Sequence, residues 1–382
     1  MNSPVSNQDE IIVPSMKRSK GRPRKSKRSA QGGNRSSGIF GVPAVRNGLL
    51  AIVVIVVGYI LLGKISPYRD LQFSQVGVYV IALAGLSLLV GQSGQITLGQ
   101  GAVMMVGAYT TALVNKHLNL AFPLEILLSA IVAGLFGILV GIVAARLRGP
   151  YLAGVTLSIA LALPELASKF SSIFGGDAGL IVSPPNTPAF LGATYTQQRF
   201  MVSIVLVVTV LVIFGLANLY SSRQGRKLRA VRDDEVSAEL NGIPLAGTQI
   251  TAFMIASVCA GIAGSLQAMV AQNAGPESFT VALSISLLAA IVIGGVGTLG
   301  GAVWGGLALV FIPQFATDYS QRLNLSQGVV ANLALAIYGL LLIAVILVFP
   351  GGVQGGLLRL AKYISIRFRS RGSSEIAGGL GK

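Results

Sequence analysis

Polar residues that could bind a solute gather in one glycine-rich stretch of the chain. The stretch GQSGQITLGQG, residues 91–101, carries the amides of Gln92 and Gln95 and the hydroxyl of Thr97 between two strongly apolar runs. Amide groups in an apolar medium need hydrogen-bond partners, and glycine weakens a helix. Where apolar runs cross a membrane, irregular backbone is tolerated only if protein buries it or a watery cavity adjoins it. The stretch therefore predicts a broken helix whose amides face protein or a solute path.

A second glycine-rich interruption lies further along the chain. The stretch IGGVGTLGGAVWGG, residues 293–306, again separates two apolar segments. Broken helices in corresponding parts of two halves of a transporter indicate its solute path. Glycines also let helices approach closely, so tight packing through small residues explains them equally well, and both explanations stay open. The candidate path residues from the two stretches are Gln92, Gln95, Thr97, Gly294, Gly295 and Thr298.

The remaining reactive residue types form no catalytic or metal-binding pattern. The chain has 13 Asp and Glu residues, one cysteine and one histidine. One cysteine cannot form an intrachain disulfide, and with a single histidine it cannot supply a zinc site. The phosphate-binding motif GxxxxGK[ST] and the nucleophile motif GxSxG are both absent from the sequence. We therefore expect no enzyme activity, no cofactor and no metal, and no ATPase activity of the chain itself.

An all-α membrane fold must position the candidate residues. Hydrophobic residues make up 53% of the chain and charged residues only 11%, against about 25% charged residues in soluble proteins. A helix needs roughly 20 apolar residues to cross the hydrocarbon core of a membrane. The sequence thus predicts a polytopic α-helical integral membrane protein with about ten segments, some of them broken or short. The predicted segments are residues 44–63, 73–90, 101–114, 124–145, 151–168, 200–219, 250–271, 281–296, 302–316 and 332–349.

The distribution of basic residues predicts that both termini are cytoplasmic. Cytoplasmic loops of membrane proteins are rich in Lys and Arg. With the N-terminus inside and ten crossings, 23 of the 29 Lys and Arg residues fall on the cytoplasmic side. The six others are Lys64, Arg69, Lys116, Lys169, Arg199 and Arg322. We expect a multi-pass protein of a bacterial-type plasma (inner) membrane.

Basic segments flank the predicted membrane domain, residues 44–350. Residues 1–43 contain MKRSKGRPRKSKRSAQGGNRSSG, a composition typical of a disordered cytoplasmic tail. Its core GRPRK resembles an arm that reads A·T tracts in the minor groove, which leaves a membrane-tethered nucleic-acid binder as an alternative. A polybasic tail beside a membrane is attracted to anionic lipid, so we expect lipid and not nucleic acid as its partner. Residues 351–382 form a second basic cytoplasmic tail.

The charged region at residues 220–249 is too polar to enter the membrane. Within it, DDEVSAELNG predicts a short amphipathic helix, which Gly242 and Pro244 end as stop signals. Such a helix suits docking to another protein. A solvated loop that follows the positive-inside rule would explain the charges without any partner.

Five blocks of sequence between about residues 75 and 360 together form a specific pattern. They are LVGQSGQITLGQGAVMMVGAYTTALV, GPYLAGVTLSIALALPEL with FGGDAGL, GRKLRAVRDDEVSAELNGI, GPESFTVALSISLLAAIVIGGVGTLGGAVWGG and YGLLLIAVILVFPGGVQG. In this order they resemble the LivM-type permeases of branched-chain amino acid ABC importers, and the third block resembles the loop on which the ATPase docks.

Three positions depart from the pattern of that family. Gln100 stands where histidine is usual, Phe174 stands where threonine is usual, and Asn241 replaces an apolar residue in the docking stretch. These differences leave the transporter class intact.

The resemblance implies a mechanism and a set of partners. Two permease subunits, expected as a hetero-dimer, line one path, and two ATP-binding cassette subunits dock on their cytoplasmic loops. An extracytoplasmic solute-binding protein delivers branched-chain amino acids, and ATP binding and hydrolysis switch the path between outward- and inward-facing states. On this resemblance, the docking residues are Asp234, Glu235, Glu239 and Gly242.

Other transporter classes and one other site stay open. Urea or short-amide ABC permeases look similar to the sequence. A secondary transporter would also use broken helices, but it usually needs ionisable residues at depth, and the chain offers almost none. Glu165 is interpreted as a helical ion-pair partner of Lys169, four residues later. The family often has a glutamate at this position, so a solute-binding role is the alternative.

The predicted topology can be tested with single cysteines in a background that lacks the native cysteine. Asn34→Cys, Gln224→Cys and Ser373→Cys should stay shielded from a membrane-impermeant thiol reagent in intact cells, because the surrounding basic residues keep these regions inside. Asn186→Cys and Asn324→Cys should be labelled. Labelling at position 224 would overturn the topology.

Overall fold

The computed structural model describes the chain in four main ranges and several short pieces near the C-terminus. They are residues 67–118, 120–147, 149–187, 196–322, 336–337, 339–340, 343–344, 347, 352–357 and 359. The predicted tail 1–43 and the predicted first segment 44–63 lie outside the described residues. Most of the predicted tenth segment and most of residues 351–382 also lie outside them.

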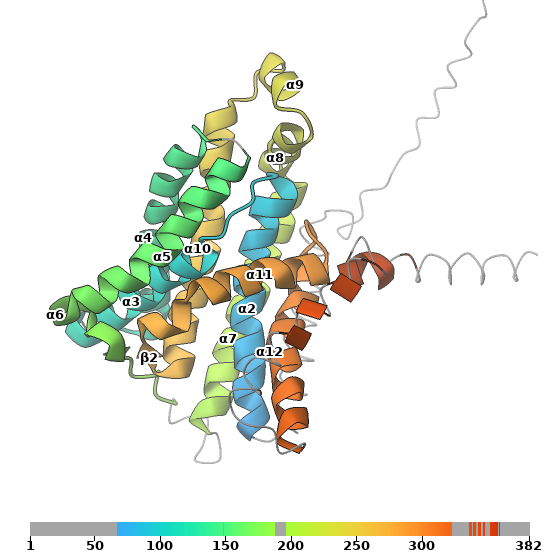
Figure 1. Cartoon of the computed structure of the whole chain (residues 1–382). Coiled ribbons are helices and arrows are strands. Elements are labelled where there is room, and N and C mark those ends of the chain that lie inside the picture. Colours follow the sequence, from blue (N-terminus) through green and yellow to red (C-terminus); the bar gives the residue numbers. More distant parts are fainter. Residues whose placement is uncertain are drawn as a thin grey trace, which may run out of the picture. The chain divides into compact units, whose positions relative to one another are not determined.

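Helices joined by short connections make up nearly all of the described structure (Figure 1). The longer helices are α2 (Pro67–Ser87), α3 (Gln100–Leu118), α4 (Phe122–Ala144), α5 (Pro150–Lys169), α7 (Gln197–Ser221), α8 (Arg223–Asp233), α10 (Leu245–Ala271), α11 (Val281–Gly294) and α12 (Leu299–Arg322). The shorter elements are a π-helical turn (Leu88–Gln92), α6 (Ser171–Phe174), α9 (Glu235–Leu240), the 3-10 turns Gly176–Ala178 and Pro276–Phe279, and the strands β1 (Leu180–Ile181) and β2 (Asn273–Ala274).

Six of the described helices are long and apolar enough to cross a membrane. They are Arg69–Gln92, Phe122–Ala144, Tyr151–Lys169, Gln197–Ser221, Leu245–Ala271 and Pro276–Gly294. Helix α12 adds a shorter apolar stretch, Leu299–Phe315. The predicted all-α, multi-pass membrane fold is confirmed, whereas the predicted count of ten segments is not confirmed by the described residues.

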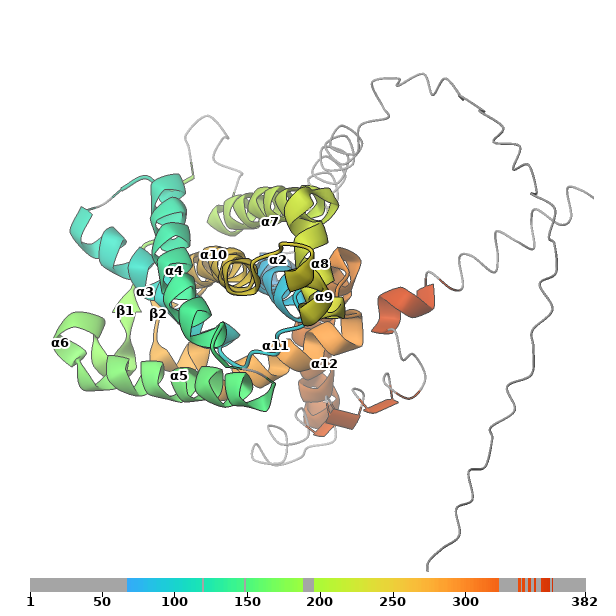
Figure 2. The ribbon, with the colours of Figure 1, turned by 90° about the horizontal axis from the view of Figure 1, so that it is seen from above.

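Helix α10 forms the centre of the packing, with α4 on one side and α2 on the other (Figure 2). Small residues allow helices to approach this closely. The backbone of Gly107 on α3 lies against the backbone of Gly261 on α10, and Gly264 lies against the carbonyl of Met104. A side chain at Gly261 or Gly264 would push two helices apart, so these glycines are packing residues.

Three hydroxyl groups join α3, α4 and α10 inside this core. The Thr111 hydroxyl oxygen lies 2.7 Å from the hydroxyl oxygen of Ser129 and 2.7 Å from that of Ser265. All three residues are fully buried. Hydrogen bonds between membrane helices contribute about 0.6 kcal/mol on average, so the cluster adds directional contacts to the packing of small residues.

A two-residue antiparallel ladder ties the connection that follows α6 to the end of α10. Leu180 pairs with Ala274, and Ile181 pairs with Asn273. The Asn273 amide also donates to the carbonyl of Ala178 at 3.2 Å. The ladder therefore fixes the far end of α5 and α6 to the central helix.

The packing role of Gly261 can be tested against a matched glycine in an open position. Gly261→Ala should lower the thermal midpoint of the purified protein, because the new Cβ would meet Ala133 and would lie 2.7 Å from the Ser129 carbonyl oxygen. Overpacking of this kind costs about 1–3 kcal/mol. Gly215→Ala on α7 should leave the midpoint unchanged or raise it, because nothing lies near its Cβ position and alanine favours a helix. Equal midpoints for the two variants would contradict the packing role.

Candidate functional site

The chain leaves α-helical geometry after α2, over residues 88–99, which we call the first break. The π-helical turn ends at Gln92, and residues 93–99 are non-helical. Two backbone hydrogen bonds close the turn, from the Ser93 N–H to the Leu88 carbonyl and from the Gln95 N–H to the Leu89 carbonyl, both 3.1 Å. Gly94 has a φ of 74°, which favours glycine. The predicted interruption of the helix is thus confirmed.

Residues 295–298, the second break, separate α11 from α12. Helix α11 runs across α2 and α12 in Figure 1 and ends at Gly294. Gly295 and Gly297 follow with φ values of 122° and 80°. The Thr298 hydroxyl donates to the Gly295 carbonyl at 3.0 Å and accepts from the Gly301 N–H at 3.1 Å. Thr298 therefore caps the start of α12.

The two breaks lie against each other. Gly91 is in direct backbone contact with Gly297, where a side chain at Gly91 would not fit. The Gln92 side chain donates from Nε2 to the Gly297 carbonyl at 2.9 Å. The Ser87 hydroxyl lies 3.4 Å from the carbonyl oxygen of Thr298. Of the six candidate path residues, Gln92 and Thr298 are thus brought to this contact.

Gly294 and Gly295 also lie at close backbone contacts. Gly294 lies against the carbonyl of Gly301 at the start of α12, and Gly295 lies against Gly352 in the helical piece 352–357. The Trp304 indole N–H donates to the side chain of Gln354 in the same piece at 3.0 Å. These contacts are those that close packing through small residues requires. A path role for either glycine stays a prediction.

Two arginines on α8 reach the first break. The Arg229 guanidinium donates to the Gln92 Oε1 at 3.0 Å and to the Tyr220 carbonyl at 3.1 Å. The Arg232 guanidinium donates to the Gly91 carbonyl at 2.6 Å. Because Gln92 also contacts the second break, a continuous set of hydrogen bonds joins α8 to both breaks.

Helix α8 corrects the expectation of one short helix within residues 220–249. Ser222 begins α8 as its N-cap, since its hydroxyl accepts from the N–H groups of Gln224 and Gly225. Leu228 and Val231, three residues apart, share its buried face. The serine and this spacing were signals in the sequence, but the surrounding basic residues led to the interpretation as a loop.

Helix α9 is the predicted short helix, and it has a defined cap at each end. The Asp234 carboxylate accepts from the N–H and the hydroxyl of Ser237, at 3.1 and 2.8 Å. These bonds lower the pKa of Asp234, so the cap persists above the ordinary pKa of aspartate and is lost as the pH falls through the lowered value. Gly242, with a φ of 77°, ends the helix, and its N–H bonds to the Glu239 carbonyl.

Two apolar side chains on α9 project from the protein, and the sequence interpretation missed them. Val236 and Leu240 are 69% and 84% exposed, four residues apart. They share one face of the helix, near the exposed Glu239. The signal was the spacing of two apolar residues within an otherwise polar segment. Exposed apolar residues on a short capped helix fit contact with another protein.

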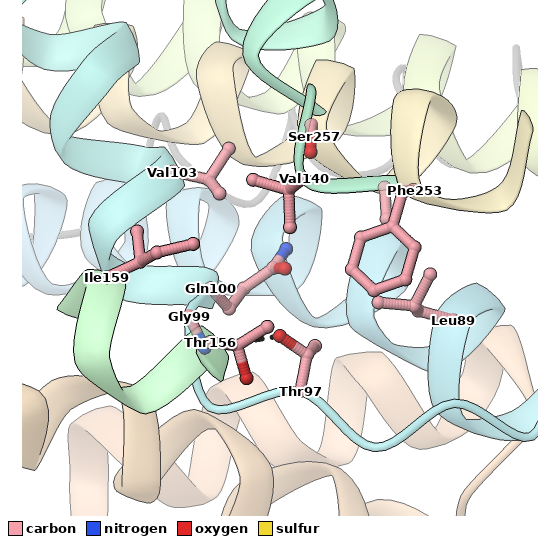
Figure 3. Close-up of a pocket in the computed structure, with 11 residues that line it drawn as sticks. Leu89, Thr97, Gly99, Gln100, Val103, Val140, Thr156, Ile159, Phe253 and Ser257 are labelled. Carbon is pink, nitrogen blue, oxygen red and sulfur yellow. Dashed lines mark hydrogen bonds between the residues drawn. The ribbon is translucent and has the colours of Figure 1, made fainter. Parts of the chain in front are cut away.

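Thr97 and Gln100 lie in a closed region, shown in Figure 3. Its walls come from the first break and from α3, α4, α5 and α10, and it holds a cavity of only about 10 Å³, room for about one water molecule. The Thr97 hydroxyl accepts from the Gly99 N–H at 3.2 Å, and the Thr156 hydroxyl accepts from the Leu98 N–H at 3.0 Å. The Gln100 amide donates to the Ala82 carbonyl at 3.2 Å. In this conformation, no solute fits beside Thr97.

Gln95 faces a different and larger cavity, of about 470 Å³, which also touches α5, α8, α9 and α10. Pockets of this size accommodate small ligands. The sequence grouped Gln92, Gln95 and Thr97 together, but the irregular backbone of the first break carries the three side chains to three different surroundings.

The exposed faces of α4 and α5 differ in chemistry. The exposed large side chains of α4 are all aliphatic, as lipid contact requires. The exposed side of α5 instead includes Tyr151, Ser158, Glu165 and Lys169. A membrane-spanning helix seldom turns ionisable groups toward lipid, so this side of α5 fits a watery path or a partner subunit. The predicted ion pair between Glu165 and Lys169 is wrong, since none joins these two described residues; both side chains point to the exterior.

Two buried carboxylates escaped the sequence interpretation. Glu125, 2% exposed, lies in the first turn of α4 and accepts from the Asn115 amide at 3.1 Å. Asp70, in the first turn of α2, lies 3.8 Å from the guanidinium Nε of Arg199. Both sit at helix N-termini, where the helix dipole favours a negative charge. In the described part of the chain, no group of three or more His, Cys, Asp or Glu residues could hold a metal ion.

Comparison with known families decides the class of the protein. The family described as "Branched-chain amino acid transport system / permease component" matches residues 71–346. The chain belongs to this family. The matched range includes both breaks, α8 and α9, and the exposed side of α5.

Individual relatives of this permease family carry different names. The permease protein LivM of the high-affinity branched-chain amino acid transport system of Salmonella typhimurium is 32% identical over 272 residues, which are 66% of this chain and 64% of the relative. The chain thus spans about 64% of the length of that relative. The permease LivH of the same organism is 26% identical, over 72% of this chain and 91% of the relative. The fructose import permease FruG of Bifidobacterium longum is also 26% identical, over 73% and 84%.

A solved structure, PsaBC from Streptococcus pneumoniae in complex with Fab, is 13% identical and has a TM-score of 0.41. The comparison covers 80% of this chain and 99% of that chain.

The contact between the breaks predicts a specific loss on substitution of Gln92. Gln92→Leu should lower the stability of the purified permease by about 1–3 kcal/mol, because the partly buried Gly297 carbonyl and the Arg229 guanidinium each lose a partner. Gln198→Leu, on the exposed start of α7, is the matched control and should change the thermal midpoint little. The contact would be unimportant if both variants unfolded at the wild-type temperature.

Proposed function

We propose that the chain is the permease subunit of an ABC importer for branched-chain amino acids, driven by separate ATPase subunits. One observation carries the proposal: two arginines of α8, next to the exposed helix α9, donate hydrogen bonds into the glycine-rich first break. A transporter powered by another subunit needs such a connection between its docking surface and its path. We call α8 and α9 the docking helices.

The proposed mechanism starts at α9. An ATPase subunit contacts the exposed Val236, Glu239 and Leu240, and caps at both ends let α9 move as a rigid unit. The displacement passes through Arg229 and Arg232 to the first break. Because Gln92 also bonds to Gly297, the second break moves with the first, and α11 and α12 change their angle to α2. The chain supplies binding and movement, and it catalyses no reaction of its own.

A second permease subunit is proposed to meet the exposed side of α5. Polar and ionisable groups on this side avoid lipid if they border a water-filled path between two subunits. Relatives named LivM and LivH both match the chain, which supports a hetero-dimer of two related permeases. An extracytoplasmic binding protein completes the proposed importer by delivering the solute.

Branched-chain amino acids are the proposed solutes because the family description and the LivM relative name them. The fructose permease among the relatives carries another solute by its name, so membership of the family leaves the solute to be tested. Urea and short amides are the alternatives among ABC permeases. A secondary transporter is less well supported, since the two buried carboxylates lie at helix ends, beside Asn115 and Arg199.

The domain organisation and the topology are part of the proposal. Residues 44–350 form the membrane domain in a bacterial-type inner membrane, and both basic tails are cytoplasmic, where anionic lipid attracts residues 1–43. The docking helices then face the cytoplasm, as contact with an ATPase requires. Uptake should therefore survive deletion of residues 1–40 if the tail is accessory, as a lipid-attracted segment would be.

The docking role of α9 can be tested by co-purification. Leu240→Asp and Glu239→Arg should each reduce recovery of the ATPase subunits by about tenfold or more, because a charge is buried or reversed at the proposed contact. Purified alone, the permease should hydrolyse no ATP. Gln198→Leu, at the other end of α7, should leave recovery and uptake at wild-type level.

Uptake in proteoliposomes with all partners decides the solute. Leucine, isoleucine and valine should be taken up when ATP is present, and urea and fructose should not. Full leucine uptake without any ATPase subunit would instead favour the secondary transporter. Uptake of urea or fructose alone would keep the ABC importer and replace its solute.

A further inference from the structure

The cavity of about 470 Å³ beside Gln95 lies where the path and the docking helices meet. The first break, the start of α5, the docking helices and the start of α10 all contribute to its walls. Figure 1 shows the docking helices beyond the end of α2, at the same end as the starts of α5 and α10. Nothing in the described residues fills this space, whereas the cavity beside Thr97 has room for about one water molecule.

Two residues that line the cavity each carry a buried polar atom with no hydrogen-bond partner among the described residues. The atoms are the Ser93 hydroxyl oxygen and the Gln95 Oε1, in residues that are 5% and 8% exposed. A buried polar group without a partner costs about 1–3 kcal/mol. Two such atoms, in residues two positions apart that line one cavity, indicate a place where a bound molecule supplies the missing hydrogen bonds.

Charged groups of both signs also line the cavity. Arg232 on α8 contributes its guanidinium, whose NH1 bonds to the Gly91 carbonyl and whose Nε and NH2 bond to the exposed carboxylate of Asp233. These three bonds leave two of its five N–H groups for a ligand. Glu235 on α9 contributes a carboxylate to the wall. Guanidinium groups bind carboxylates well, and carboxylate and amide oxygens accept from an ammonium group. The polar wall therefore suits a ligand that carries both an ammonium and a carboxylate.

Apart from Gln249 on α10, the rest of the cavity wall is apolar or glycine. Ile96, Leu147, Leu152 and Val231 come from the first break, the turn before α5, α5 itself and α8. Apolar surface opposite a few placed polar groups is the usual composition of a small-molecule site. The apolar residues suit a short branched aliphatic chain.

We propose that this cavity is a release-side binding site for a zwitterionic aliphatic amino acid. The inference rests on the proposed function, because it takes the docking helices to mark the side on which the solute leaves. Gln95 and Ser93 bind the ammonium group, Arg232 binds the carboxylate, and the apolar residues contact the aliphatic chain.

The position of the site gives it a second property. Its walls belong both to the first break and to the docking helices, so a bound amino acid joins the two and holds them in the arrangement of this structure. A ligand can shift an equilibrium only toward the state that it binds better. Solute that accumulates on the docking side therefore slows transport by retaining this conformation.

Direct binding is the first test. The permease complex, assembled with its partner subunits in nanodiscs without nucleotide or binding protein, should bind radiolabelled leucine saturably. 4-Methylpentanoate and 3-methylbutylamine, which lack the ammonium and the carboxylate respectively, should compete at least about tenfold more weakly.

Two variants and two matched controls place this binding in the cavity. Gln95→Leu removes the amide and Ala153→Phe fills the space from α5, and each should weaken leucine binding by about tenfold or more. Gln198→Leu and Gly215→Phe make the same kinds of change on exposed surfaces of α7 and should leave binding unchanged. Because Ala153→Phe leaves every polar group in place, a folding defect of Gln95→Leu would not prevent the test.

Transport separates the inference from the function on which it rests. In proteoliposomes, leucine added on the ATPase side should slow wild-type transport and should not slow Gln95→Leu or Ala153→Phe. Active wild-type transport with leucine binding that neither variant weakens would overturn the site and leave the importer intact. An inactive wild-type complex would refute the importer, and binding that both variants abolish would still support the site.

Discussion

The backbone contact between Gly91 and Gly297 is the constraint on which the rest of the site depends. It requires glycine, because a side chain at position 91 would overlap the opposite backbone. Two helices that lose their hydrogen-bond ladders at the same point leave carbonyl and N–H groups that need partners. Gln92, Thr298 and the arginines of α8 supply those partners. The broken geometry is thus stabilised from both sides, and it is not a region of missing contacts.

This arrangement explains why basic residues lie beside a glycine-rich turn. Arg232 bonds to the carbonyl of Gly91, so it recognises the turn by its backbone and not by a side chain. In a continuing α-helix the Gly91 carbonyl would accept from the Gln95 N–H, which here bonds to the Leu89 carbonyl instead. The break therefore leaves the Gly91 carbonyl available to Arg232, and this bond holds the docking helices to the break.

The sequence predicts the class of fold and the existence of both breaks because each rests on local composition: long apolar runs, and glycines with amides between them. Helix α9 was predictable for the same reason, since acidic residues precede it and Gly242 follows it. Helix α8 was not, because its basic residues resemble a solvated loop until the burial of Leu228 and Val231 is known.

The distribution of the candidate site residues could not be read from the sequence either. Gln92, Gln95 and Thr97 are close in number, but the chain passes from a π-helical turn into non-helical backbone between them. Partners distant in the chain decide the surroundings of each side chain. The contact of Gln92 with Gly297 spans 205 positions. No local pattern encodes such a pairing.

The shallow burial of α5 has a consequence for the way in which the protein can deform. In the most apolar 18-residue stretch of α5 only 22% is buried inside the protein, against 67% in the corresponding stretch of α10. The two-residue β1–β2 ladder connects the far end of α5 to the end of α10. Regions with few buried contacts open at a lower free energy than the core and often do so as a unit. Helix α5 should therefore exchange its backbone amide protons ahead of α10. It can move as a unit that pivots at the β1–β2 ladder, while the glycine-packed helices around α10 stay in place.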